Sequence, residues 1–104
     1  MKGIMATLQI VYWRDIPAQV KTRAGRERGA AQCSQRFQDA IDAAAMRAGL
    51  IGTDDYLAEW RTGDSIEREG APDGVAQAAV AELEAAYSDE RLRALIANSG
   101  REGG

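Results

Sequence analysis

Two runs of alternating apolar and polar residues, separated by a polar pair, constrain the fold more than any other feature of the sequence. Residues 7–13 alternate as a β-strand does, and residues 16–23 alternate again after Arg14 and Asp15. Because aspartate tolerates turn geometry, the polar pair predicts a tight connection between two antiparallel strands. The sequence therefore predicts an N-terminal β-hairpin, although a longer loop, a bulge or one extended segment also fits the pattern.

The two strands of this hairpin differ in what their faces carry. In the first strand, simple alternation places Leu8 on one face and Trp13 on the other, so both faces are bulky. The second strand has one polar face and contains Pro17, which cannot donate a ladder hydrogen bond. We therefore expect the second strand at a sheet edge, where strand addition by a partner is possible.

A loop and then a helix are predicted next. Residues 23–30 contain two glycines and three arginines, a composition that predicts an exposed loop. Apolar residues recur at helical spacing over residues 34–48, with Ser34 placed as the N-cap. Gly49 and Leu50 then stand where a Schellman motif would end this helix.

The second half of the chain has one ambiguous segment and two clear helices. Residues 53–69 fit either a helix or a strand, and the aromatic residues together with a Gly-Asp turn slightly favour the strand. Residues 75–87 place alanine, valine and leucine on one helical face, and residues 88–96 begin with an N-cap serine and two acidic residues. We predict that residues 99–104, which are polar and rich in glycine, form a disordered tail.

These elements predict one small α+β domain over residues 1–98. A chain of 104 residues is long enough for one core and too short for two. The predicted order is a β-hairpin, a helix, a third strand and two C-terminal helices, with no internal repeat.

Composition excludes several classes of chemistry. The chain has no histidine, which removes Ser-His-Asp and Cys-His catalysis and every His-ligated metal site. With a net charge of −3, the chain lacks the broad positive field that binding to nucleic acid requires. The first ten residues resemble neither a signal peptide nor a membrane span. A chain with one cysteine cannot form an intrachain disulfide. We therefore expect a cytoplasmic protein with no membrane partner and no cofactor.

Cys33 is the one candidate nucleophile. It precedes a predicted helix start, where the helix dipole lowers a thiol pKa. A small buried residue is the favoured interpretation, because free cysteine is usually buried. Asp54, Asp55 and Glu59 lack the spacing of a calcium loop, so neither a catalytic residue nor a metal site is predicted.

One set of residues has the composition of a protein-binding surface. Tryptophan and arginine dominate binding hot spots, and both occur at the hairpin turn and again near residue 60. An equal alternative is that the aromatic residues fill the core and the polar pair is only a turn. The predicted partner-binding residues are Trp13, Arg14, Asp15, Pro17, Trp60 and Arg61.

A second set of residues predicts an anion site. Arg26 and Arg28 are flanked by glycines, and such arginines can hold a phosphate or a carboxylate. Together with Arg14 they form the alternative anion-binding set. The segment matches no phosphate-binding motif, so an exposed and solvated loop is the favoured interpretation.

Three stretches carry a family resemblance. "IVYWRDIPAQV", "RFQDAIDAAAMRAGL" and "DDYLAEWR" resemble the bacterial virulence-factor domain family over residues 8–61. That family has no catalytic motif, its domain occurs alone or joined to helical repeats, and stand-alone members can be encoded near corrinoid and tetrahydrofolate methyl-transfer proteins. The resemblance implies a non-catalytic accessory or adaptor protein that binds a partner protein. The alternative is a small subunit that binds an anionic cofactor or substrate for one-carbon methyl transfer.

Overall fold

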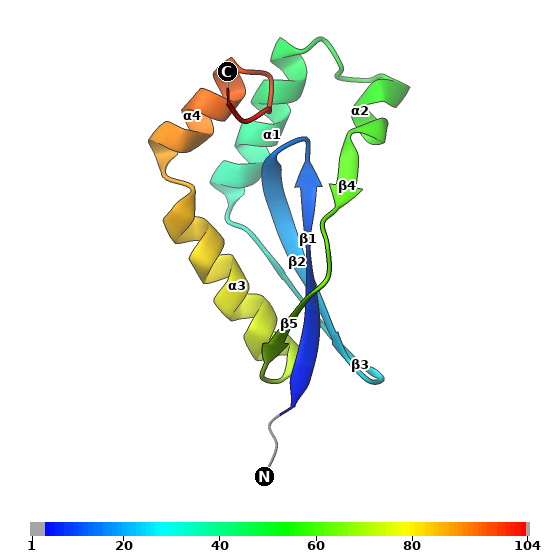
Figure 1. Ribbon diagram of the computed structural model, residues 1–104. Helices are drawn as coiled ribbons and strands as arrows, with labels where there is room; N and C mark the ends of the chain where they lie inside the picture. Colours follow the sequence, from blue (N-terminus) through cyan, green and yellow to red (C-terminus); the bar gives the residue numbers. More distant parts are fainter. Residues whose placement is uncertain (1–3, 104) are drawn as a thin grey trace.

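The fold is an antiparallel β-sheet with helices packed on one face (Figure 1). The computed structural model describes residues 4–103. Its elements in chain order are β1 (Met5–Trp13), β2 (Ile16–Ala24), β3 (Glu27–Gln32), α1 (Gln35–Arg47), α2 (Asp54–Ala58), β4 (Trp60–Thr62), β5 (Ile66–Glu69), α3 (Pro72–Ala86) and α4 (Asp89–Ala97). The predicted α+β class is confirmed. Residues 1–3 and Gly104, which the predicted domain and tail include, lie outside the described residues.

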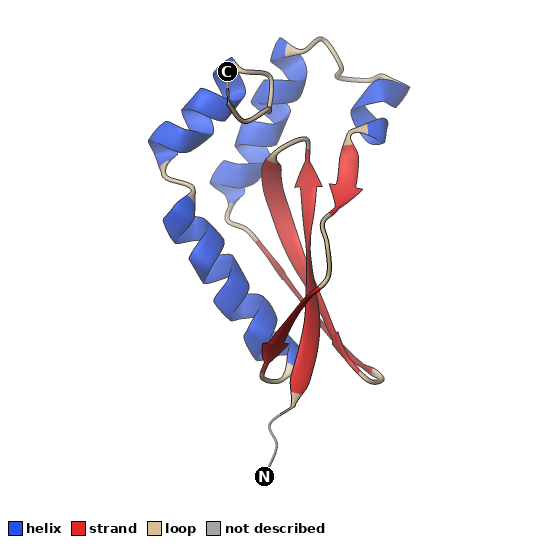
Figure 2. Cartoon of the chain, in the orientation of Figure 1, coloured by secondary structure: helices blue, strands red, loops and turns tan. Residues whose placement is uncertain are grey.

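β1 is the strand on which the sheet is organised. One edge of β1 pairs with β2, which in turn pairs with β3, and the other edge pairs with β5 and then β4. α3 lies across β1, β2 and β3 on one face of this sheet (Figure 2). The opposite face, which we call the open face, carries half-buried and exposed side chains. On the three longest strands its members are Thr7, Gln9, Val11, Gln19, Lys21, Arg23, Arg28, Ala30 and Gln32.

The predicted β1–β2 hairpin is confirmed, with Arg14 and Asp15 as its turn. Arg14 supplies the left-handed conformation that this turn needs, with φ of 53°. Ala18 has no partner in β1, so the pairing register shifts between Val11 and Tyr12. Trp13 nevertheless belongs to the same buried core as Leu8, because Tyr56 and Gly100 pack against its ring.

The prediction of a loop over residues 23–30 is wrong, because β3 lies there. Gly25, with φ of +61°, closes a second hairpin between β2 and β3. β2 is consequently an internal strand, and the predicted edge position is also wrong. Pro17 is tolerated because β3 ends opposite Gln19 and leaves Pro17 without a neighbour on that side.

The first helix and its termination are as predicted. α1 begins after Ser34, although the serine side chain makes no capping hydrogen bond to the helix. At the other end Gly49 has φ of +75°, and the Leu50 N–H donates to the carbonyl of Ala45 at 2.9 Å. The Gly49 N–H donates to the carbonyl of Met46 at 3.0 Å, which completes the Schellman motif.

The ambiguous segment contains both a helix and strands. Residues 54–58 form the short helix α2, so the preference for a strand is wrong there. Thr53 caps this helix by accepting a hydrogen bond from the Tyr56 N–H at 3.3 Å. The strand prediction holds for β4, where Trp60 pairs with Trp13 of β1, and for β5.

The two C-terminal helices are confirmed. α3 begins at Pro72, which occupies the first turn of the helix, where its missing N–H costs nothing. α4 begins after Ser88, whose hydroxyl accepts a hydrogen bond from the Arg91 N–H at 3.1 Å. Together with α1 they cover one side of the molecule (Figure 2).

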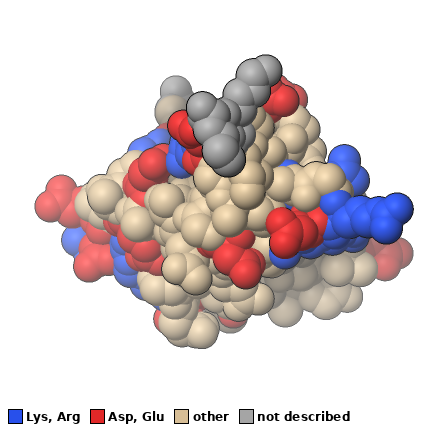
Figure 3. Space-filling model, turned by 90° about the horizontal axis from the view of Figure 1, so that it is seen from below, with Lys and Arg blue, Asp and Glu red and all other residues tan. Residues whose placement is uncertain are grey.

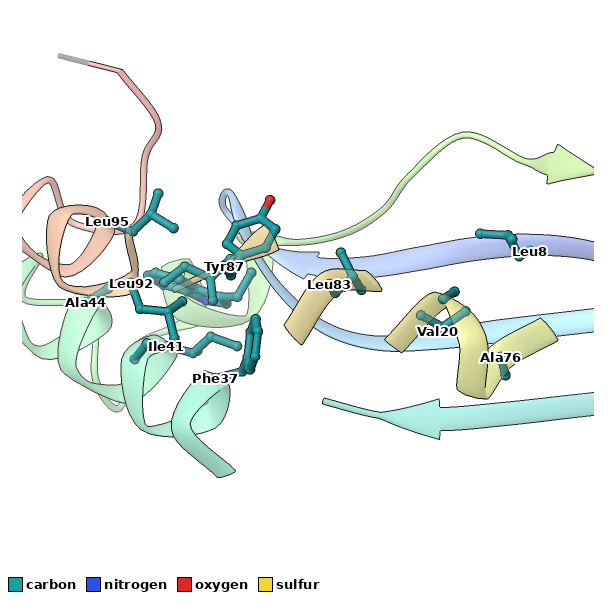
Figure 4. Packing of buried hydrophobic residues seen from close by; sticks show 14 of the residues in the cluster. Leu8, Val20, Phe37, Ile41, Ala44, Ala76, Leu83, Tyr87, Leu92 and Leu95 are labelled. Atoms are coloured by element: carbon teal, nitrogen blue, oxygen red, sulfur yellow. The ribbon is translucent and has the colours of Figure 1, made fainter. Parts of the chain in front are cut away.

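The hydrophobic core is continuous along the molecule, which measures 51 × 28 × 23 Å. Figure 4 shows it running from Leu8 and Val20, beside the sheet and α3, to Leu95 of α4. Phe37 and Tyr87 meet edge to face at its middle, with ring centroids 5.9 Å apart. Much of the rest is alanine, so these large side chains carry most of the apolar burial.

The segment after α4 differs from the disordered tail that we predict. Gly100 is buried, and its carbonyl accepts a hydrogen bond from the Asp15 N–H at 2.8 Å. Glu102 donates its N–H to the Asp15 carboxylate at 2.6 Å. The β1–β2 turn supplies these partners, and sequence patterns in the tail itself could not reveal them.

Candidate functional site

The predicted partner-binding residues lie together at the β1–β2 turn. Trp13 is fully buried, and its indole N–H donates to the carbonyl of Tyr56 at 2.9 Å. The Tyr56 ring lies 5.7 Å from the Trp13 ring and 6.3 Å from the Trp60 ring. Tyr56 is not among the predicted residues, and the short helix α2 places it against both tryptophan rings.

Burial removes two of the six predicted residues from the surface. Trp13 and Pro17 are core residues, so neither side chain is available to a partner in this conformation. Arg14 is almost as enclosed, with 12% of its side chain exposed, and it donates to the Ser99 carbonyl at 2.9 Å. The alternative that these residues form the core and the turn is the one that the structure favours.

The remaining members of this set are bound to one another. Arg61 donates to an Asp15 carboxylate oxygen at 3.1 Å and to the carbonyl of Arg14 at 3.0 Å. Its guanidinium lies 4.4 Å from the Tyr12 ring centroid. These contacts join the turn, β4 and the segment after α4. The arrangement is a structural junction with its charges already paired.

The alternative anion-binding set is not brought together. Arg14 lies at the β1–β2 turn, whereas Arg26 and Arg28 lie beside the β2–β3 turn at the other end of the sheet (Figure 1). β2 spans about 26 Å between the two turns at about 3.3 Å per residue. A single small anion cannot contact all three arginines, and this part of the prediction is wrong.

Arg28 instead belongs to a group of cations on the open face. Lys21 and Arg23 project from β2 on the same face as Arg28 of β3, because these positions pair in register. They line a hollow of about 640 Å³, which we call the basic groove. Its lining residues are Thr7, Gln9, Lys21, Thr22, Arg23, Arg28, Gly29, Ala30, Ser65 and Asp73.

The charges of the basic groove have no carboxylate partners. None of Lys21, Arg23 and Arg28 forms an ion pair within residues 4–103, although the chain is acidic overall. Asp73 also lines the groove, but it forms no ion pair with any of the three cations. Figure 3 shows basic side chains protruding at the right of the view, the side on which the β2–β3 turn lies. The cations are clustered on the β2–β3 side, and Glu67 of β5 lies across Thr7 from Arg23 on the same face.

Arg23 and Arg28 are the most informative members of the groove. They lie directly opposite each other on neighbouring strands. Like charges in directly opposite positions of a sheet destabilise it, because their side chains start only about 5 Å apart. Sequence reasoning places Lys21 and Arg23 near Arg26 and Arg28 in one charged stretch, but a loop prediction cannot show which of these side chains share a face.

Cys33 does not have the environment of a nucleophile. Burial and the nearby Glu84 carboxylate raise the pKa of its thiol to about 11, against a smaller opposing effect of Arg36. The thiol therefore stays protonated at neutral pH, where a nucleophilic cysteine needs its thiolate form.

The described residues contain neither a metal-binding cluster nor a membrane-spanning helix. In residues 4–103 no cluster of cysteine, aspartate and glutamate side chains could hold a metal ion. None of the described helices has the length and apolar character needed to cross a bilayer.

Comparison with known proteins identifies a family. Searches of curated proteins and of solved structures give no match. The family model described as "Virulence factor" matches residues 11–96, which is most of the chain and includes every element from β2 to α3. This match extends the resemblance seen in residues 8–61 through the C-terminal helices, and the chain belongs to the virulence factor family.

Proposed function

We propose that this member of the virulence factor family is a non-catalytic accessory protein that binds an acidic segment of a partner protein in the basic groove. The observation that supports the proposal is the facing pair Arg23 and Arg28, with Lys21 beside them and no carboxylate partner in the described chain. Such a cluster costs folding stability through repulsion. An acidic ligand would turn this repulsion into attraction, with charge-assisted hydrogen bonds from both guanidinium groups.

The size and the charge of the groove favour a peptide segment. A hollow of about 640 Å³ accommodates a few side chains of an extended chain. Phosphate-backbone binding requires a broad positive surface, whereas this chain has a net charge of −3 and only a local basic end. The single, protonated cysteine is consistent with the reducing environment of the cytoplasm, which we propose as the compartment.

Charge reversal in the groove tests this function. Wild-type protein, Arg23→Glu and Arg93→Glu would each be used to capture a partner from a lysate of the native cell. Arg93 is a matched control, because it is an exposed arginine of α4 that forms no ion pair with a described residue. We expect one stoichiometric partner to be retained by wild type and Arg93→Glu and to be lost by Arg23→Glu. Retention by all three proteins would contradict the proposal.

The one-carbon methyl-transfer hypothesis supplies the second candidate. In this hypothesis Lys21, Arg23 and Arg28 of the basic groove would bind an anionic cofactor or substrate, and Arg14 would take no part. Melting temperatures in the presence of tetrahydrofolate and of inorganic phosphate distinguish this ligand class. A rise for wild type and Arg93→Glu but not for Arg23→Glu, with no protein captured, would favour the small anion over a peptide.

A further inference from the structure

The outer edge of β3 has free backbone hydrogen-bonding groups. In an antiparallel pair, residues alternate between bonding the neighbouring strand and pointing away from it. The Cys33 N–H donates to the Ala18 carbonyl at 3.0 Å, which sets this alternation for β2 and β3. By this alternation, the backbone groups of Ala31, Gly29 and Glu27 bond to β2. The N–H and C=O groups of Arg28, Ala30 and Gln32 therefore point away from β2.

No described part of the chain uses this edge. None of the hydrogen bonds within residues 4–103 involves the outward backbone groups of Arg28, Ala30 or Gln32. The three side chains are exposed, and Ala30 at the centre is too small to shield the backbone. β3 contains no proline, and its pairing with β2 is in regular register, so neither a proline nor a β-bulge blocks this edge, and Arg28 is its charged outward residue.

The same edge borders the basic groove. Arg28 is at once an outward-pointing edge residue and a member of the groove, and Lys21 lies opposite Ala30 on the next strand. In a strand added outside β3, the residues facing Arg28 and Ala30 would have side chains on the open face. Because Ala30 is small, a carboxylate facing it has an unobstructed path toward the Lys21 ammonium.

Charge decides which occupant fits the edge. A second copy could pair β3 with β3 about Ala30, since all three outward residues would then find partners. That arrangement would join two basic grooves on one continuous sheet face, and repulsion would oppose it. A partner strand with acidic residues at alternate positions places opposite charges there instead.

We propose that an extended acidic segment of the partner protein adds to β3 as a further antiparallel strand, with its acidic side chains on the open face above Arg28, Arg23 and Lys21. This inference rests on the proposed function and adds to it a binding mode. Backbone hydrogen bonds to the β3 edge hold the segment, and the cations select acidic residues at alternate positions.

Hydrogen exchange and peptide binding test this mode. The probe is a short labelled peptide in which glutamate alternates with threonine, and the control peptide has lysine in place of glutamate. In the free protein we expect the amides of Arg28, Ala30 and Gln32 to exchange quickly and those of Gly29 and Ala31 to be protected. The glutamate peptide should protect the first three amides, and the lysine peptide should not.

Two variants separate the edge from the charges. Ala30→Pro removes an outward N–H without removing a bond to β2, whereas Ala30→Thr keeps that N–H. We expect Ala30→Pro, with unchanged circular dichroism, to weaken peptide binding at least about tenfold and Ala30→Thr to bind as wild type. Arg23→Glu should also weaken binding and leave the backbone edge intact.

The outcomes distinguish the binding mode from the function. If Arg23→Glu abolishes binding while Ala30→Pro has no effect and the amides stay unprotected, strand addition is wrong and the acidic-ligand function stands. If the glutamate peptide fails to bind the wild type, or binds Arg23→Glu as tightly as the wild type, both strand addition and the acidic-ligand function are wrong. Protection of the same amides on self-association, without peptide, would show that a second copy occupies the edge.

Discussion

Replacing Trp13 with alanine gives the sharpest test of whether this residue is part of the core or of a contact surface. The side chain is fully buried and packs against Tyr56, and an added methyl group at Gly100 would lie 2.9 Å from the indole ring. Its N–H donates to the Tyr56 carbonyl at 2.9 Å. Alanine would therefore leave a cavity between β1, α2 and the segment after α4, and it would also remove a hydrogen bond.

The expected loss is a large fraction of the total stability. Truncation of a buried tryptophan to alanine costs about 3–5 kcal/mol, to which the lost hydrogen bond contributes about 1 kcal/mol. A domain of this size has a free energy of unfolding of roughly 5–15 kcal/mol. A loss of about 4 kcal/mol corresponds to a fall in melting temperature of about 20 °C.

Urea unfolding followed by circular dichroism measures this loss without relying on tryptophan fluorescence. Trp60→Ala is the matched control, because Trp60 pairs with Trp13 but is only half-buried, and its substitution should cost clearly less. A Trp13→Ala protein with a urea midpoint close to that of wild type would refute the core assignment. Loss of partner binding by an unfolded Trp13 variant would say nothing about a contact surface.

Two further predictions concern backbone packing and pH. An added methyl group at Gly29 would lie 2.7 Å from a backbone carbon of α3, so Gly29→Ala should lower the free energy of unfolding by about 1–3 kcal/mol, whereas Gly74→Ala, with open space around it, should be neutral or stabilising in urea titrations. Burial favours the neutral acid at Glu84, yet hydrogen bonds from Ser34 and Arg36 lower the pKa of this carboxyl below its ordinary value of 4.5. The stability that it contributes is complete above that ordinary value and is lost as pH falls through the lower folded-state pKa, so thermal unfolding below about pH 4.5 should depend less on pH in Glu84→Gln.

Local sequence patterns were sufficient where an element is defined by its own residues. The β1–β2 turn, the start of α4 at Ser88 and the end of α1 at Gly49 all follow from residues within a few positions of each other. Burial along α1 also follows from its own periodicity.

The errors concern elements that other parts of the chain stabilise. β3 contains glycine and two alanines, which have low strand propensity, and it forms because β2 and α3 supply the pairing and packing. At Gly29 the approach of α3 leaves no room for a side chain, so a residue that weakens an isolated strand is required here. Propensity within a short window cannot contain this information.

The candidate site could be predicted only in part, for the same reason. Lys21 and Arg23 become partners of Arg28 only through the register of β2 and β3. Conversely, Trp13 and Pro17 have the residue types of a binding surface but are buried, and α2 and the segment around Gly100 pack against Trp13. Residue type alone does not distinguish a residue that binds a partner from a residue that is buried in the core.

The contact between Gly100 and the β1–β2 turn has a consequence for how the protein folds during synthesis. The hairpin around Trp13 is synthesised early in the domain, whereas Gly100 follows nearly all the rest of the domain in the chain. Until then the indole has no cover on that side, and the nascent hairpin displays an apolar surface. Packing around this turn is therefore completed only when the last residues of the domain have been synthesised.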